Sequence, residues 1–540
     1  MTVALPSIPA PCILDMVHHN PGEPPYETKY ESPGVIRAMG FGGKVYHLFD
    51  SPMLAVNWEA VDPDIFPKDS DARAWVDAKA ARIDAQHAAC AAAGVGIYAM
   101  SDLVLFPRRL VEKYNLGREM GNPLNPSTAH FLRLLVAQMF DRFPLLDGLV
   151  VRIGETYLHD APWHVGKIEN RNDWRATIAP LMRLMREELC VKRGRHLIFR
   201  AWLSFDTDLE TYRAVSDAVE PHPLLTISVK HCEGDFHRGN PFSKVIGEGR
   251  HRQLIEVQCA REYEGKGAYP NYIARGVIEG FAEHRRLAER GALWSIGEFA
   301  RARPDLFAGV WTWSRGGGWQ GPYIKNEFWC DLNAWVMARW AADPAQPEEA
   351  VFARHAADVL GLRGADAARF RRLCLLSSDA AFLGRRSACC DIDPWWSRDE
   401  FFGKPVLPDG ADCGEKTGRI LSEKDEAVAM WEEIAALSAQ IGFPDGETKV
   451  HVVASCEYGL RLCRIMRAIF RLAAAESRDA RPGELRALLG DYDEVWRSYR
   501  RLPEDHPSCA TLYKERGSPW GPPPGVEAWI PRLREKAVPF

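Results

Sequence analysis

Three carboxylates follow short apolar runs of the sequence. Glu155 comes after "GLVVRI" (148–153), Asp235 after "LLTISVK" (224–230), and Glu262 after "QLIEVQC" (253–259). A set of this kind can keep one carboxyl group protonated as a general acid while another stays ionised as a base. Hydrolysis of a glycosidic bond requires that division of roles.

Cations and aromatic rings occupy similar positions in the sequence. The remaining candidates for ligand contact at the ends of apolar runs are Trp58, Asp102, Tyr157, Arg200, Trp202, Lys230, Trp313, Arg315 and Trp319. Arg200 and Lys230 could keep Asp235 ionised, and they could also bind an anionic group of a substrate. An indole outside an apolar run can form a flat wall for a sugar ring. Each residue alone could instead make a structural ion pair or fill the core, but the whole set favours a functional site.

The spacing of the apolar runs predicts the fold that would bring these residues together. Eight β-branched runs are expected to be strands: 35–41, 53–58, 94–100, 148–153, 196–204, 224–230, 253–259 and 309–314. Amphipathic helical patterns such as 71–94 and 173–194 lie between most of them, and this alternation is typical of a parallel sheet. Eight such strands favour a (β/α)₈ TIM barrel, in which the loops after the strands form the active site. The first two runs are too close together to enclose a helix.

The pattern changes after about residue 345, where three long segments read as helices and no comparable strand follows. The sequence therefore predicts an N-terminal extension (1–33), an α/β catalytic barrel (34–344) and a mostly α-helical C-terminal domain (345–540). The segment 389–403, which includes Cys389 and Cys390, could cap the site, pack between the domains or form a homodimer contact.

Composition excludes several classes of protein. The net charge of −5 over 540 residues gives no basic surface for nucleic acid or for a membrane. No apolar run reaches the length of a membrane span. The 13 Cys residues are scattered without a C-x-x-C motif, which argues against a disulfide framework. No signal peptide is recognisable at the N-terminus, so we expect a cytoplasmic protein.

Residues 148–345 resemble the α-glucuronidases of glycoside hydrolase family 67, which remove glucuronic acid from xylan-derived oligosaccharides. The stretches that carry the resemblance are "DGLVVRIGETY", "FRAWLS", "ISVKHCEGDFHRGNP", "LIEVQCAREYEG" and "FWCDLNAWVMARWAADP", in the same order as in the family. The family's usual N-terminal β-rich domain is missing. Three turns also differ, and one difference places Arg261 beside the proposed base.

The resemblance implies an inverting glycosidase. By position, Glu155 matches the general acid, whereas Asp235 and Glu262 match the pair that holds the attacking water. Arg200 and Lys230 match residues that bind the uronate, and Trp58 is similar to a tryptophan that lines the sugar pocket. The implied partner is an oligosaccharide with an acidic sugar. No cofactor is expected.

Other interpretations remain open. His231, Cys232, Asp235 and His237, with His159 and His164, could be read as a metal cluster, but their spacing is irregular and no metal is expected. The glycines of "SRGGGWQGP" (314–322) lack the Lys-Ser/Thr of a phosphate loop. A barrel hydrolase for a different acidic or neutral glycoside is the main alternative, followed by a catalytically silent carbohydrate-binding protein.

Overall fold

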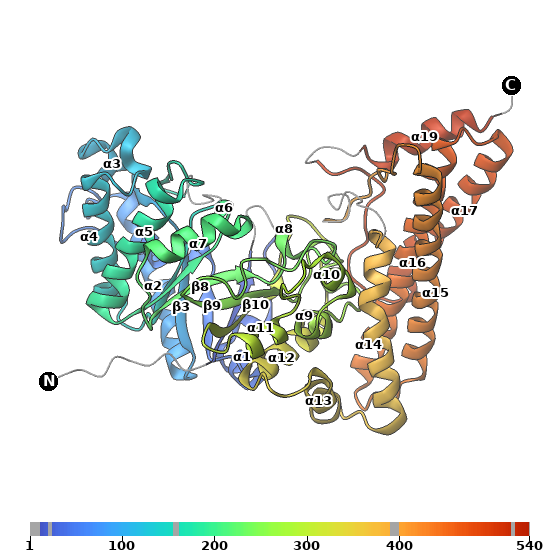
Figure 1. The fold of residues 1–540 in the computed structure, drawn as a ribbon, viewed down its shortest axis with the longest axis horizontal. Helices are drawn as coiled ribbons and strands as arrows, with labels where there is room; N and C mark the ends of the chain where they lie inside the picture. Colours follow the sequence, from blue (N-terminus) through green and yellow to red (C-terminus); the bar gives the residue numbers. More distant parts are fainter. Residues whose placement is uncertain (1–10, 20–23, 155–160, 389–398, 520–523, 539–540) are drawn as a thin grey trace.

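The chain folds into a closed barrel of eight parallel strands, followed by a largely helical region (Figure 1). The computed structural model describes residues 11–19, 24–154, 161–388, 399–519 and 524–538. The barrel strands are β1 (Cys12–His18), β2 (Gly43–Tyr46), β3 (Gly96–Asp102), β5 (Gly148–Arg152), β7 (His196–Arg200), β8 (Leu225–Lys230), β9 (Arg252–Gln258) and β10 (Phe307–Gly316). Neighbouring strands follow the order β1-β10-β9-β8-β7-β5-β3-β2, and β2 closes the ring on β1. The predicted TIM barrel is confirmed.

Two of the predicted strands are wrong. Residues 35–41 lie mostly in helix α1 (Pro33–Met39), which begins with Pro33 in its first turn and ends at Gly40 with a φ of 114°. These are ordinary start and stop signals of a helix. Residues 53–58 overlap a 3₁₀ turn (Pro52–Ala55), whose four residues are all buried.

The first two strands lie elsewhere. Strand β1 has the sequence "CILDMVH" and all seven of its residues are buried, whereas β2 has only four residues. The barrel therefore begins inside the segment 1–33 that was predicted to be an extension. A buried aspartate, Asp15, interrupts the apolar run of β1 and conceals the strand in the sequence.

Most of the helices around the barrel follow its strands in the chain. They are α1, α2 (Asp71–Ala92), α3 (Arg108–Lys113), α4 (Pro126–Arg142), α5 (Ala179–Met185), α6 (Ser204–Thr207), α7 (Leu209–Ala218), α8 (Glu233–Phe236), α9 (Ala274–Glu279), α10 (Ala282–Leu287), α11 (Ile296–Ala302) and α12 (Phe328–Ala342). Several begin at side-chain caps: Ser70 accepts from the Arg73 amide at the start of α2, and Asn125 accepts from two amides at the start of α4. A two-stranded antiparallel sheet, β4 (Leu105–Pro107) with β6 (His164–Gly166), is built from segments that follow β3 and β5.

The C-terminal region is helical, as predicted. It contains α13 (Glu348–Arg354), α14 (Gly364–Arg385), α15 (Cys413–Gln440), α16 (Gly446–Ser477), α17 (Pro482–Arg500), α18 (Leu502–Asp505) and α19 (Val526–Lys536). Helix α16 packs against α14, α15 and α17, which explains why it is buried along much of its length. In Figure 1 these helices, gold to red, lie beside the barrel along the long axis. No helix in the described ranges is long and apolar enough to cross a membrane.

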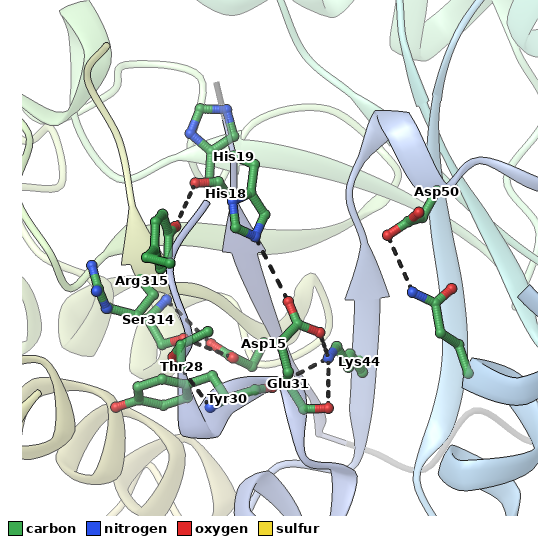
Figure 2. Close-up of polar contacts among 12 residues, drawn as sticks. Asp15, His18, His19, Thr28, Tyr30, Glu31, Lys44, Asp50, Ser314 and Arg315 are labelled. Carbon is green, nitrogen blue, oxygen red and sulfur yellow. Dashed lines mark hydrogen bonds and ion pairs between the residues drawn. The ribbon is translucent and has the colours of Figure 1, made fainter. Parts of the chain in front are cut away.

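A buried polar cluster joins the first strand of the barrel to the last (Figure 2). Thr312 and Ser314 of β10 donate hydrogen bonds to the carboxylate of Asp15 at 2.6 and 2.8 Å. Burial raises the pKa of Asp15 to about 7. Beside it, Lys44 of β2 donates to Glu31 at 2.5 Å. The contacts around Asp15 stabilise the seam at which the barrel closes.

Candidate active site at the barrel mouth

The carboxyl ends of the eight strands converge at one mouth, where active sites of this fold lie. Polar or aromatic residues stand at or just beyond almost every strand end there: His18, His47, Asp102, Arg152, Arg200, Lys230, Gln258 and Trp313. The predicted residues Asp102, Arg200, Lys230 and Trp313 are thus brought to one end of the barrel. The same end receives Asp235 and Glu262 from the loops that follow β8 and β9.

Two buried ion pairs lie beneath the mouth. Asp102 of β3 pairs with Arg152 of β5 at 2.6 Å. Arg200 of β7 donates to both carboxylate oxygens of Glu256 on β9, each at 2.8 Å. Arg200 is only 1% exposed, and Glu256 already neutralises its charge. Its guanidinium also packs against two aromatic rings, 4.6 Å from the centre of Trp202 and 5.0 Å from that of Trp313.

Trp202 lies where several cations meet. The Lys230 ammonium lies 3.8 Å from the centre of its ring, and the Arg200 guanidinium lies 4.6 Å from it. The indole also packs against Gly154, where a Cβ atom would come within 1.7 Å of the ring. This contact explains why glycine precedes Glu155. Glu155 and Tyr157 themselves lie outside the described residues.

Asp235 lies on an unusual stretch of backbone. Gly234, Asp235 and Phe236 all have positive φ, at 60°, 53° and 67°. Such conformations are uncommon for residues other than glycine, and they cluster at functional sites. The Asp235 side chain is 42% exposed and accepts a hydrogen bond from Lys230 at 2.7 Å. The nearby ammonium group favours the ionised carboxylate.

Glu262 lies against the loop that follows β10. It is 6% exposed, and its Oε2 atom accepts a hydrogen bond from the backbone amide of Gly318 at 2.5 Å. An amide that donates to a carboxylate favours its ionised form. Arg261, which the sequence places next to Glu262, forms its ion pair with Glu264 at 3.1 Å.

Two histidines that lie at the mouth are not predicted from the sequence. His18 ends β1 and His47 follows β2; their ring centres are 4.7 Å apart, and that of His18 is 4.8 Å from the Trp313 ring. Burial holds the pKa of His47 well below its usual range, so its imidazole is neutral near pH 7. The sequence marks neither position clearly, because Asp15 interrupts the run that His18 ends and the strand before His47 has only four residues.

Three residues that were predicted to contact a ligand are in contact with other parts of the protein. Trp58 is 0% exposed and packs against Phe106 and Phe131, which is not the position of a pocket wall. Arg315 pairs with Glu327 at 2.8 Å. Trp319 has its backbone amide bound by Asp399, from the segment that follows α14.

Of the residues in the alternative metal cluster, His164, His231, Cys232 and His237 are buried, and His159 lies outside the described residues. His231 lies against Phe236 and His237 against Tyr263, and burial lowers the pKa of His237 to about 3. Burial raises the pKa of the Cys232 thiol to about 12. Across the part of the chain that the structure describes, no group of three or more His, Cys, Asp or Glu side chains is arranged to hold a metal ion.

Comparison with known proteins identifies a shared fold. No family model and no curated protein matches the sequence. A solved structure of a glycoside hydrolase family 138 enzyme that targets pectin rhamnogalacturonan II aligns with a TM-score of 0.57 and 14% identity, over 98% of this chain and 67% of that one. CpGH84D and CpGH84B, of glycoside hydrolase family 84, align at TM-scores of 0.42 and 0.45 with 11% and 9% identity, over 97% and 96% of this chain and 74% and 76% of theirs. The chain therefore shares a barrel fold with a glycoside hydrolase, and its likeness to family 67 stays a prediction from sequence.

Proposed function

We propose that this protein is a glycoside hydrolase whose active site is the mouth of the barrel. One observation carries the proposal: Asp235 and Glu262, from the loops after the adjacent strands β8 and β9, each have a donor that favours the ionised form. The Lys230 ammonium that donates to Asp235 also lies over the Trp202 ring, 3.8 Å from its centre. In glycoside hydrolysis, ionised carboxylates are the groups that activate water at the sugar.

In the proposed mechanism, Asp235 and Glu262 hold and deprotonate the attacking water, and Glu155 protonates the leaving oxygen. A water placed between base and anomeric carbon inverts the configuration. The assignment of Glu155 rests on its position directly after Gly154, which packs on the Trp202 ring. The order of strand-end residues that resembles family 67 supports the same roles.

For the substrate we propose an α-linked glucuronic acid, or a related uronic acid, at the end of an oligosaccharide such as one derived from xylan. Lys230 supports an acidic sugar because its ammonium, which lies over the Trp202 ring at the mouth of the barrel, could pair with a carboxylate of the substrate. The family 138 neighbour targets pectin rhamnogalacturonan II.

A different or neutral glycoside is the second candidate. The two cations that were expected to bind a uronate each pair with a carboxylate, namely Arg200 with Glu256 and Lys230 with Asp235. Arg315, another predicted contact residue, pairs with Glu327. A site whose charges balance in this way can also accept an uncharged sugar.

Proton NMR of the purified protein with an aldotriouronic acid tests the proposal. We expect the first anomeric signal of the released sugar to be that of β-glucuronic acid, before mutarotation. Release of the α anomer would overturn inversion. No release from this substrate, but turnover in a panel of neutral and galacturonic glycosides, would favour the second candidate. No turnover of any glycoside by folded protein would reject the hydrolase function.

A further inference from the structure

A carboxylate from outside the barrel binds the loop that contacts Glu262. Asp399 follows α14 in the chain and is 3% exposed. Its Oδ1 atom accepts hydrogen bonds from the amides of Trp319 and Gln320 at 2.8 and 2.9 Å, and from the Lys266 ammonium at 2.9 Å. The negative charge of Asp399 is therefore directed at the loop that follows β10.

Three successive amides of this loop are divided between two carboxylates. The Gly318 amide donates to Glu262, and the next two amides donate to Asp399. Because the backbone between these amides has few rotatable bonds, a shift of the loop at Asp399 must also move the Gly318 amide. The hydrogen bond to Glu262 thus depends on a residue outside the barrel.

The glycines of the loop permit this close arrangement. Gly316, Gly317 and Gly318 have φ values of 91°, 111° and 69°, which disfavour other residues. A Cβ atom on Gly318 would lie 2.7 Å from the Asp399 carboxylate, and one on Gly317 would lie 3.0 Å from the Glu262 side chain. The backbone of the loop therefore lies close to Asp399 at Gly318 and close to Glu262 at Gly317.

The helical region is itself fixed to the barrel at neighbouring points. Arg385 of α14 donates to the backbone oxygen of Tyr263, the residue after Glu262, at 2.9 Å. Thr511 donates its amide to the oxygen of Tyr323 at 3.0 Å and accepts from the Tyr323 amide at 2.7 Å. These hydrogen bonds fix the helical region, to which Asp399 belongs, against the barrel.

We propose that Asp399 is a positioning residue of the active site, through which the helical region sets the Gly318 amide on Glu262. The inference rests on the proposed role of Glu262 as part of the water-activating pair. Asp399 touches no reacting atom in this scheme. Its contribution is to fix the orientation and the ionised form of Glu262.

Two variants of Asp399 test the proposal in the full-length protein. Asp399→Ala removes the acceptor, and we expect kcat to fall by about a hundredfold with KM changed far less, because small displacements of a catalytic group cost that much. Asp399→Asn keeps an acceptor oxygen but loses the charge opposite Lys266. Its kcat should therefore lie between those of the wild type and Asp399→Ala. The acidic limb of the kcat profile should move to higher pH in Asp399→Ala, because Glu262 then loses the donor that favours its ionised form.

Hydrogen exchange followed by mass spectrometry gives a readout that needs no activity. Peptides covering residues 316–320 should exchange faster in Asp399→Ala than in the wild type. Asp493→Asn, which breaks an ion pair with Arg534 on the surface of the helical region, is the matched control and should change neither exchange nor kcat. If Asp399→Ala does not fold, Asp399→Asn supplies both measurements.

The outcomes separate the two proposals. Unchanged exchange and unchanged kcat in a folded Asp399 variant would overturn the positioning role. Faster exchange with unchanged kcat would also overturn it, because the loop would then not control Glu262. If the wild type turns over no glycoside, the proposed function fails, and with it the role in catalysis, while the exchange data still decide whether Asp399 holds the loop.

Discussion

Lys230 lies with its ammonium group 3.8 Å from the centre of the Trp202 ring. The same nitrogen donates to Asp235 at 2.7 Å, so one cation contacts both the aromatic surface and the proposed base. The position of Asp235 is in turn fixed by a turn of positive φ. These contacts couple the binding surface to the carboxylate that would activate water.

Replacement of Lys230 should change the pH dependence of the reaction. In Lys230→Met the Asp235 carboxylate loses its cation, so it should take up a proton at a higher pH. We expect the acidic limb of kcat/KM to move to higher pH. The matched control is Lys113→Met, which removes a surface pair with Asp62 and Asp64. An acidic limb that stays in place would show that Lys230 does not control the base.

Glu155→Gln should distinguish the acid from the base. Loss of a general acid lowers kcat by about 10²–10⁴-fold, and a substrate with a fluoride or nitrophenolate leaving group should recover most of that loss because it needs little protonation. Asp235→Asn should be slow on both kinds of substrate. Equal losses for Glu155→Gln on good and poor leaving groups would remove the acid assignment. Binding of the sugar, measured by calorimetry, should persist in both variants.

The contact between Gly154 and Trp202 predicts an effect on both stability and activity. In Gly154→Ala the new methyl group would overlap the Trp202 ring, so the indole or the strand end must shift, at a cost of about 1–3 kcal/mol in the free energy of unfolding. Turnover should fall as well. The matched control is Gly490→Ala in α17, where a Cβ meets nothing within 4 Å and helix propensity predicts stabilisation by about 1 kcal/mol. Urea unfolding of the two variants measures the difference.

The stability of the barrel seam should depend on pH through Asp15. Its pKa in the folded protein is about 7, above the value of about 3.9 in an unfolded chain. The native state therefore binds this proton more tightly, so the stabilisation is present below about pH 4 and is lost as the pH rises through 7. Asp15→Asn resembles the protonated form and should gain stability relative to the wild type between pH 5 and pH 8. If the free energies of unfolding of Asp15→Asn and the wild type differ by a constant amount over this range, the shifted pKa is contradicted.

Most of the barrel is predictable from sequence because its later strands are continuous buried runs. The six barrel strands after residue 94 coincide with predicted runs, since their apolar residues are buried on both faces, whereas the short strands β4 and β6 outside the barrel are not predicted. The first two strands were not, because Asp15 interrupts β1 and β2 is too short to stand out. Residues 35–41 contain Val and Ile but begin after Pro33 and end at Gly40, and these caps outweigh the β propensity.

The same errors limit the prediction of the site. His18 and His47 follow the two strands that were misplaced, so nothing marked them as residues of the mouth. Trp58 was expected to follow a strand, yet its chain forms a 3₁₀ turn and its indole is buried. Pairings such as Arg200 with Glu256 join residues 56 positions apart, and spacing in a single sequence does not reveal them. Asp235 and Glu262 were placed at the mouth because their strands were placed correctly.

The seam between β1 and β10 has a consequence for how the protein is made. The hydrogen bond from Thr312 to Asp15 joins residues 297 positions apart. Strand β10 must therefore leave the ribosome before β1 can pair with it. Contacts of such long range form slowly, and an apolar strand with one edge still unpaired is prone to aggregate. We expect the nascent chain to depend on chaperones until translation has passed Gly316.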